Sequence, residues 1–328
     1  MRTEFQSPLA TEIKAFLAHK RALGKLLEKA ELTFRLLDQY LINHRVRGIS
    51  DITPVLLDGF VRSRPRHTPQ SYNELLSTLR GLFDWLVRRD VLTTSPLNNQ
   101  PQRVKPGLSP FLFNSDQAKR LFDAARKMRS NPRIPDRGEI YRMAFVLLYG
   151  LGLRVGEISR LCRKDVDLVN RLLLIRHTKF GKNRLVPFGP KMTKEITQFL
   201  HQREEGVGRI PTDSPLFSFD KDKQKPIPPE RISQTFHNLL PALDLIIPAG
   251  VSPPHLHCLR HSFAVGTLLR WYRNGLDAAS RLLDLSTFLG HVSPSSTAVY
   301  LTITTELFEC ASQRFAHFAA PAFKELEP

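Results

Sequence analysis

The sequence has few cysteines and no long apolar run. Its 328 residues contain only three cysteines, Cys162, Cys258 and Cys310, which lie far apart and form no CxxC pair. This spacing argues against a disulfide framework and against a structural zinc site. The most hydrophobic run, MAFVLLYGLGL, is too short to span a bilayer, and residues 1–16 lack the apolar core of a signal peptide. We therefore expect a cytoplasmic protein with reduced thiols and no membrane partner.

Acidic side chains are also scarce relative to basic ones. The chain has 31 Asp and Glu against 48 Lys and Arg, which gives a formal net charge of +17. Such an excess favours a polyanionic partner, because neutralising phosphates releases condensed counterions and so provides affinity for any sequence. Nucleic acid is therefore the expected partner.

Apolar stripes at helical spacing predict an all-α first domain over residues 1–98. The stripes cover residues 9–24, 26–44, 54–63 and 71–92. Thr68, followed by Pro69, is a predicted helix cap, and either Asp51 or Thr53 could cap the helix over 54–63. The polar faces of these helices are rich in Arg and Lys.

A predicted linker over residues 99–114 separates this domain from a second one over residues 115–328. Pro, Asn, Gln and Ser cluster around the linker, and no helical period continues through it. The second domain reads as mainly α, with Ser115 as a helix cap and a small β-sheet. Its strands, RLLLIRH and RLVPF, flank TKFGKN as the two arms of a hairpin would.

Three short segments of the second domain carry residues with chemical potential. In YGLGLRVGEI, a glycine-rich turn precedes Arg154, and Glu157 follows three residues later. Such a turn would aim Arg154 into a cleft while Glu157 orients neighbouring groups, although surface Arg-Glu pairs are common. In HLHCLRHSFA, His257 and Arg260 share one helix face and suit a phosphate. Lys179 lies in the predicted hairpin tip, where most lysines are merely solvated.

The segment FLGHVSPSSTAVYL adds His291 and Tyr300 to this set. A tyrosine alone is most often a core residue, but its phenol can act as a covalent nucleophile. A zinc site built from His255, His257, Cys258 and His261 is disfavoured because no second cluster completes the ligand set. We expect His255 and His261 to be structural.

Four ordered motifs, GLRVGEI, TKFGKNRLVPF, HCLRHSFA and LGHVSPSSTAVYL, resemble the catalytic domain of the tyrosine recombinase (phage integrase) family. The resemblance covers about residues 110–320, and four motifs in order are far more specific than any one of them. It implies a two-domain clamp on DNA, in which the all-α first domain is a core-binding domain and the second an α+β catalytic domain.

The resemblance also implies a role for each residue. Arg154 and Arg260 would hold the non-bridging oxygens of one phosphodiester, with Glu157 in support, and Tyr300 would attack the phosphorus. His257, or the cationic pocket, would promote loss of the phenolic proton. Lys179 would protonate the departing 5′ oxygen, and His291 would position Tyr300. The broken bond would be conserved as a 3′-phosphotyrosyl link, without metal or cofactor.

The resemblance implies partners as well. These are double-stranded DNA with inverted-repeat core sites, such as those of a mobile element, and other copies of the chain. A C-terminal helix over residues 304–320 would dock into a neighbouring protomer and close a synaptic tetramer that acts through a Holliday junction. Two alternatives remain: a type IB topoisomerase-like strand transferase, and a DNA-binding architectural protein with vestigial catalytic residues.

Overall fold

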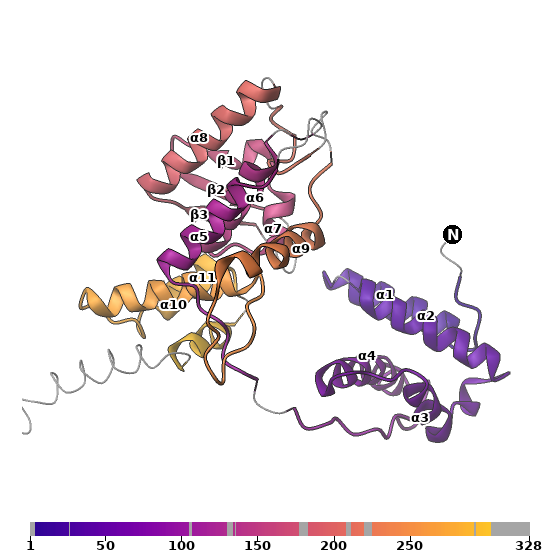
Figure 1. Ribbon diagram of the computed structural model, residues 1–328. Helices are drawn as coiled ribbons and strands as arrows, with labels where there is room; N and C mark the ends of the chain where they lie inside the picture. Colours follow the sequence, from indigo (N-terminus) through magenta and orange to yellow (C-terminus); the bar gives the residue numbers. More distant parts are fainter. Residues whose placement is uncertain are drawn as a thin grey trace, which may run out of the picture. The chain divides into compact units, whose positions relative to one another are not determined.

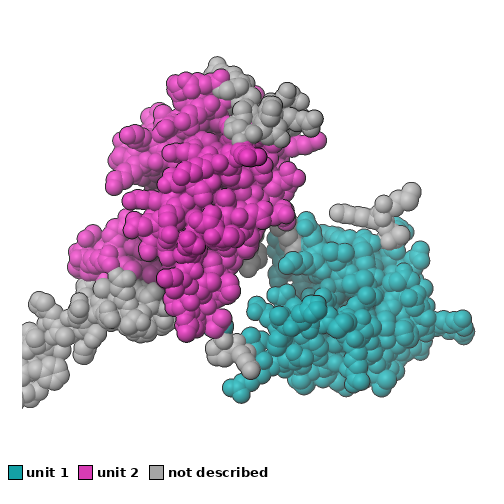
Figure 2. All heavy atoms as spheres, viewed as in Figure 1, with its two compact units in different colours: residues 1–107 teal, residues 108–328 magenta. Residues whose placement is uncertain are grey.

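The computed structural model describes residues 4–25, 27–104, 107–129, 134, 136–176, 183–207, 211–219, 225–291 and 293–302. The chain divides into two compact units, residues 1–107 and 108–328, coloured separately in Figure 2. This boundary lies within the stretch 99–114. Phe111 and Phe113, from the end of that stretch, are buried in the core of the second unit.

The described part of the first unit contains four α-helices (Figure 1), which are α1 (Ala10–Ala22), α2 (Glu28–Asn43), α3 (Pro54–Arg62) and α4 (Pro69–Val87). Threonines begin the last two. The hydroxyl oxygens of Thr53 and Thr68 accept hydrogen bonds from the backbone N–H groups of Leu56 and Ser71, at 3.3 and 3.2 Å. Each threonine thus satisfies an N–H group that the helix leaves unpaired. Helices α1, α2 and α4 pack on one another around an apolar core.

The second unit is mainly helical. Its described α-helices are α5 (Ser115–Arg126), α6 (Arg137–Gly150), α7 (Val155–Arg160), α8 (Pro190–Val207), α9 (Pro229–Leu239), α10 (Cys258–Arg273), α11 (Leu282–Leu289) and α12 (Ser295–Ala298). A short 3₁₀ helix, η5 (Val299–Thr302), follows α12. The cap of α5 is Asn114 rather than the predicted Ser115, because the Asn114 side chain accepts the N–H groups of Asp116 and Gln117.

Helix α6 forms the centre of the second unit. Every residue from Ile140 to Leu148 is buried, so the helix is covered on all sides. It packs against α5, α7, α8, α9 and α10. The apolar run MAFVLLYGLGL is therefore the middle of a folded core, and among the described residues no helix is long and apolar enough to cross a membrane.

A small antiparallel sheet lies in the same unit, with strand order β1 (Val166–Asp167), β2 (Leu172–Ile175) and β3 (Arg184–Pro187). Strands β2 and β3 are the two arms of the predicted hairpin. Leu173 pairs with Val186, and both side chains are buried. Strand β1 was not predicted, because a two-residue strand shows no alternation. The structure confirms a mainly α unit with a small sheet.

Candidate active site

A tight turn between α6 and α7 presents Arg154. Gly152 in this turn has φ +60°, and a Cβ there would lie 2.5 Å from the Phe263 ring, so glycine is required. Arg154 is the N-cap residue of α7, and its backbone N–H donates to Glu157 Oε2 at 2.9 Å. Its Nη1 also lies 3.0 Å from Glu157 Oε1. The pair is therefore part of the turn and not a surface ion pair.

Glu157 is buried, at 3% exposure, and is shared by two arginines. Arg184, at the start of β3, reaches both of its oxygens, with Nη1–Oε1 at 2.6 Å and Nη2–Oε2 at 2.9 Å. Burial favours the neutral acid, but Arg184 and then Arg154 outweigh it and hold the pKa of Glu157 at about 2. Glu157 therefore stays ionised at neutral pH.

Arg260, from the first turn of α10, is 1% exposed. Its Nη1 donates to the Gly152 carbonyl at 2.5 Å and its Nη2 to the Leu289 carbonyl at 2.7 Å. The buried Nε has no hydrogen-bond partner among the described residues. Burial and then the charge of Arg154 lower the pKa of Arg260 to about 10, so the guanidinium is still positive at neutral pH. Two mutually repelling cations close together form a site for an anion.

The end of helix α11 holds these arginines. Gly290 follows the helix in the left-handed conformation, with φ +67°, and turns the chain towards His291. The Gly290 carbonyl accepts Arg154 Nη2 at 2.8 Å, and the Phe288 carbonyl accepts Arg184 Nε at 3.0 Å. With the contact of Arg260 to Leu289, three consecutive carbonyls each accept one guanidinium group. Carbonyls at a helix C-terminus lack helical partners and carry partial negative charge.

Tyr300 lies in η5 and is buried, at 3% exposure. Its hydroxyl is 3.0 Å from His261 Nδ1. Burial raises the pKa of the Tyr300 phenol, while the positive charges of Arg260 and Arg154 act in the opposite direction. The same guanidinium groups would stabilise a phenolate once the hydroxyl lost its proton.

Two histidines, His261 and His291, contact this tyrosine, and a third, His257, contacts His261. The rings of His291 and Tyr300 are nearly parallel, with centroids 6.2 Å apart, and His291 Nδ1 is 2.6 Å from the Thr297 hydroxyl. His257, the N-cap residue of α10, contacts His261 edge to face at 4.6 Å. Burial and neighbouring charges lower the pKa values of His261 and His291 to about 4, so both rings are neutral at pH 7.

The structure thus brings together six of the seven residues that the sequence singled out: Arg154, Glu157, His257, Arg260, His291 and Tyr300. The seventh, Lys179, lies outside the described residues, as does the predicted helix over 304–320. Within the described part of the chain, no group of three or more His, Cys, Asp or Glu side chains could hold a metal ion.

Sequence reasoning missed two members of the site. His261 was expected to be structural, and His257 or the cationic pocket was expected to promote loss of the tyrosine proton. The structure places His261 Nδ1 3.0 Å from the Tyr300 hydroxyl, and the role of His257 stays a prediction. Arg184, the first residue of the predicted strand RLVPF, was given no role by the sequence, yet it pairs with Glu157. No local pattern reveals either contact, because the partners lie 39 and 27 residues away.

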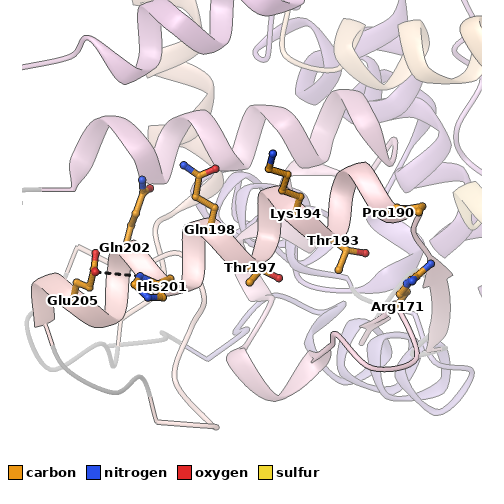
Figure 3. Close-up of a pocket in the computed structure, with 9 residues that line it drawn as sticks. All are labelled: Arg171, Pro190, Thr193, Lys194, Thr197, Gln198, His201, Gln202 and Glu205. Carbon is orange, nitrogen blue, oxygen red and sulfur yellow. Dashed lines mark ion pairs between the residues drawn. The ribbon is translucent and has the colours of Figure 1, made fainter.

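A groove of about 750 Å³ along α8 is not part of this site (Figure 3). All of its lining residues except Arg171 belong to one face of α8, where His201 and Glu205 form an exposed ion pair at 3.2 Å. None of these lining residues is among the described contacts of Arg154, Arg184 and Arg260.

Comparison with known proteins identifies the fold and the family. Residues 112–306 match the model of the phage integrase family. The Sinorhizobium fredii protein y4rB, whose name describes an integrase/recombinase, is 30% identical over 307 residues, which cover 92% of this chain and 95% of that protein. The tyrosine recombinase XerC of Listeria innocua is 29% identical over 233 residues, 70% of each chain.

Solved structures agree on the fold. The Tn1549 transposon integrase, determined in complex with transposon right end DNA, superposes with a TM-score of 0.62 at 17% identity, covering 94% of this chain and 99% of that one. The chain belongs to the phage integrase family. It is a tyrosine recombinase, an enzyme of site-specific recombination.

Proposed function

We propose that this recombinase cleaves and rejoins DNA strands through a 3′-phosphotyrosyl intermediate formed on Tyr300. The observation that carries the proposal is the position of the Tyr300 hydroxyl. It lies within hydrogen-bond distance of His261 and is influenced by the positive charges of Arg260 and Arg154. A phosphodiester placed between these guanidinium groups would bring its phosphorus towards the phenol. Both cations would gain interaction energy as negative charge develops in the transition state.

Strand cleavage in this proposal is a substitution at phosphorus. The Tyr300 oxygen forms a bond to phosphorus, its proton passes to His261, and the bond from phosphorus to the 5′ oxygen breaks. Lys179 donates a proton to that leaving oxygen, His257 and His291 contact the phosphate, and Glu157 keeps Arg154 in place. Attack by a 5′ hydroxyl of the exchanged strand reverses these steps, so religation needs no external energy source.

The assembly we propose is a clamp on duplex DNA. The first unit would act as a core-binding domain, since it is helical and its polar faces are basic. Inverted-repeat core sites would bring two copies to one duplex, and two such duplexes would form a synaptic tetramer that exchanges strands through a Holliday junction. A helix over 304–320 would link the protomers, and a mobile element would be the natural source of the sites. A DNA substrate also fits the cytoplasmic location expected from the sequence.

A suicide-substrate assay tests the chemical step. Nicked duplexes made from inverted repeats in the DNA that flanks the gene would trap the covalent adduct, since the short cleaved fragment diffuses away before religation. We expect an adduct on Tyr300, located by mass spectrometry of the linked peptide. The adduct should be absent in Tyr300→Phe, although gel-shift affinity for the intact duplex is unchanged because every cation is retained.

Two results would contradict the proposal. One is an undiminished adduct in Tyr300→Phe, and the other is wild-type protein that binds these duplexes tightly without forming any adduct. The second result would favour the architectural alternative. Relaxation of supercoiled plasmid without exchange between duplexes would favour the topoisomerase-like alternative.

A further inference from the structure

Only 11% of the Arg184 side chain is exposed, yet the chemistry above gives this residue no task. All three of its guanidinium nitrogens contact protein oxygens. Nη1 and Nη2 bind the two oxygens of Glu157, and Nε donates to the Phe288 carbonyl. Because all three nitrogens already have protein acceptors, this guanidinium is better suited to holding the fold together than to binding a phosphate.

The contacts of Arg184 join two segments that the reaction must bring together. Arg184 is the first residue of β3 and pairs with Ile175 of β2, so it closes the hairpin whose connecting segment carries Lys179. Phe288 lies in the last turn of α11, just before Gly290 and His291. A Cβ on Gly290 would approach Arg184 Nη1 to 3.0 Å, which shows how closely that turn packs on the arginine.

We propose that Arg184 is a positioning residue that fixes the β2–β3 hairpin against the turn leading to His291. The proposal rests on the proposed function, because it assigns Arg184 to the delivery of the leaving-group proton by that hairpin. The planar fork is essential to this role: it binds both carboxylate oxygens of Glu157 while Nε reaches a third acceptor. A lysine ammonium has the charge without that geometry.

Arg184→Lys separates positioning from charge, because it keeps a cation beside Glu157 and loses the fork. If the hairpin shifts by as little as ~1 Å, the step it serves should slow by about 10²-fold. That step is protonation of the 5′ oxygen. A substrate with a bridging 5′ sulfur has a leaving group that needs no proton, so it should escape the defect.

The experiment measures single-turnover adduct formation on nicked duplexes with a 5′ oxygen or a 5′ sulfur at the cleaved bond. For Arg184→Lys we expect a loss of about 10²-fold on oxygen and recovery to within about tenfold of wild type on sulfur. The matched control is Arg176→Lys. Arg176 follows β2 in the same hairpin but pairs with Asp165 at 2.5 Å, so its variant should treat the two substrates alike.

Equal defects of Arg184→Lys on both substrates, or no defect, would overturn the proposal. A larger defect on the oxygen than on the sulfur substrate in Arg184→Met, but not in Arg184→Lys, would also overturn it. That result would show that only the positive charge of Arg184 matters. If wild type itself forms no adduct, that result contradicts the proposed function and leaves the role of Arg184 to a measurement on the free protein. The imidazole NMR signals of His291 should then move in Arg184→Lys and stay in place in Arg176→Lys, and unmoved signals in both would refute the proposal.

Discussion

The buried carboxylate of Glu157 should contribute a large part of the stability of the second unit. Its pKa falls from an ordinary 4.5 to about 2, through Arg184 and Arg154 acting against burial. A difference of about 2.5 at ~1.4 kcal/mol per pKa unit corresponds to about 3 kcal/mol in favour of the ionised form. Glu157→Gln removes that charge and leaves two arginines uncompensated, and breaking a buried pair in this way costs about 3–5 kcal/mol.

We therefore expect Glu157→Gln to lower the free energy of unfolding of the second unit by about 3 kcal/mol at pH 7, and its melting temperature by about 6–12 °C. The chain offers a clean probe, because its two tryptophans, Trp85 and Trp271, lie one in each unit. In a Trp85→Phe background, urea unfolding followed by Trp271 fluorescence reports on the second unit alone.

The pH dependence checks the cause. A carboxyl with a depressed pKa stabilises the fold fully above its unfolded pKa of about 4.5 and loses that effect as the pH falls towards about 2. The difference in the free energy of unfolding between wild type and Glu157→Gln should therefore become smaller below about pH 4.5. The matched control is Asp213→Asn, whose exposed ion pair with Lys164 should matter far less. A loss of under about 1 kcal/mol for Glu157→Gln, typical of a surface pair, would refute the reasoning.

Three further predictions follow from the same cluster. Arg260→Ala should slow adduct formation by about 10²-fold or more, as loss of a transition-state donor does, and a severalfold loss would assign it to packing alone. Gly290→Ala should destabilise the second unit more than Gly250→Ala does. Both glycines have a positive φ, but of the two only a Cβ on Gly290 would crowd Arg184. Equal losses in the free energy of unfolding in urea would show that backbone strain alone matters. His291 has a pKa lowered to about 4 by burial and then by guanidinium charges, so the unfolded chain binds its proton more tightly. The free energy of unfolding should fall as the pH drops from about 6.5 to about 4, and His291→Gln should make this dependence on pH less steep. An unchanged dependence would contradict the lowered pKa of His291.

Local patterns in the sequence predicted much of this protein. Apolar spacing located the helices of the first unit, and Thr53 and Thr68 begin helices there because a hydroxyl next to a turn can satisfy a free backbone N–H. The runs RLLLIRH and RLVPF, on either side of the polar stretch TKFGKN, predicted the hairpin of β2 and β3. The family motifs supplied the six residues that lie together, although each motif displays only the spacing within its own turn or helix end. Asn114, and not Ser115, caps α5, an error of one residue at a helix end.

Only the tertiary structure decided how these pieces serve one another. No spacing in the sequence indicates that Arg154, Arg184 and Arg260 end on the carbonyls of residues 288–290, because those contacts span 136, 104 and 29 residues. Nor does any local signal make His261 the partner of Tyr300. Helix periodicity and capping arise from bonds between near neighbours, which a sequence displays directly. The sharing of Glu157 by two arginines, and of one helix end by three, arises from packing, where a buried charge binds whichever opposite group the fold brings within reach.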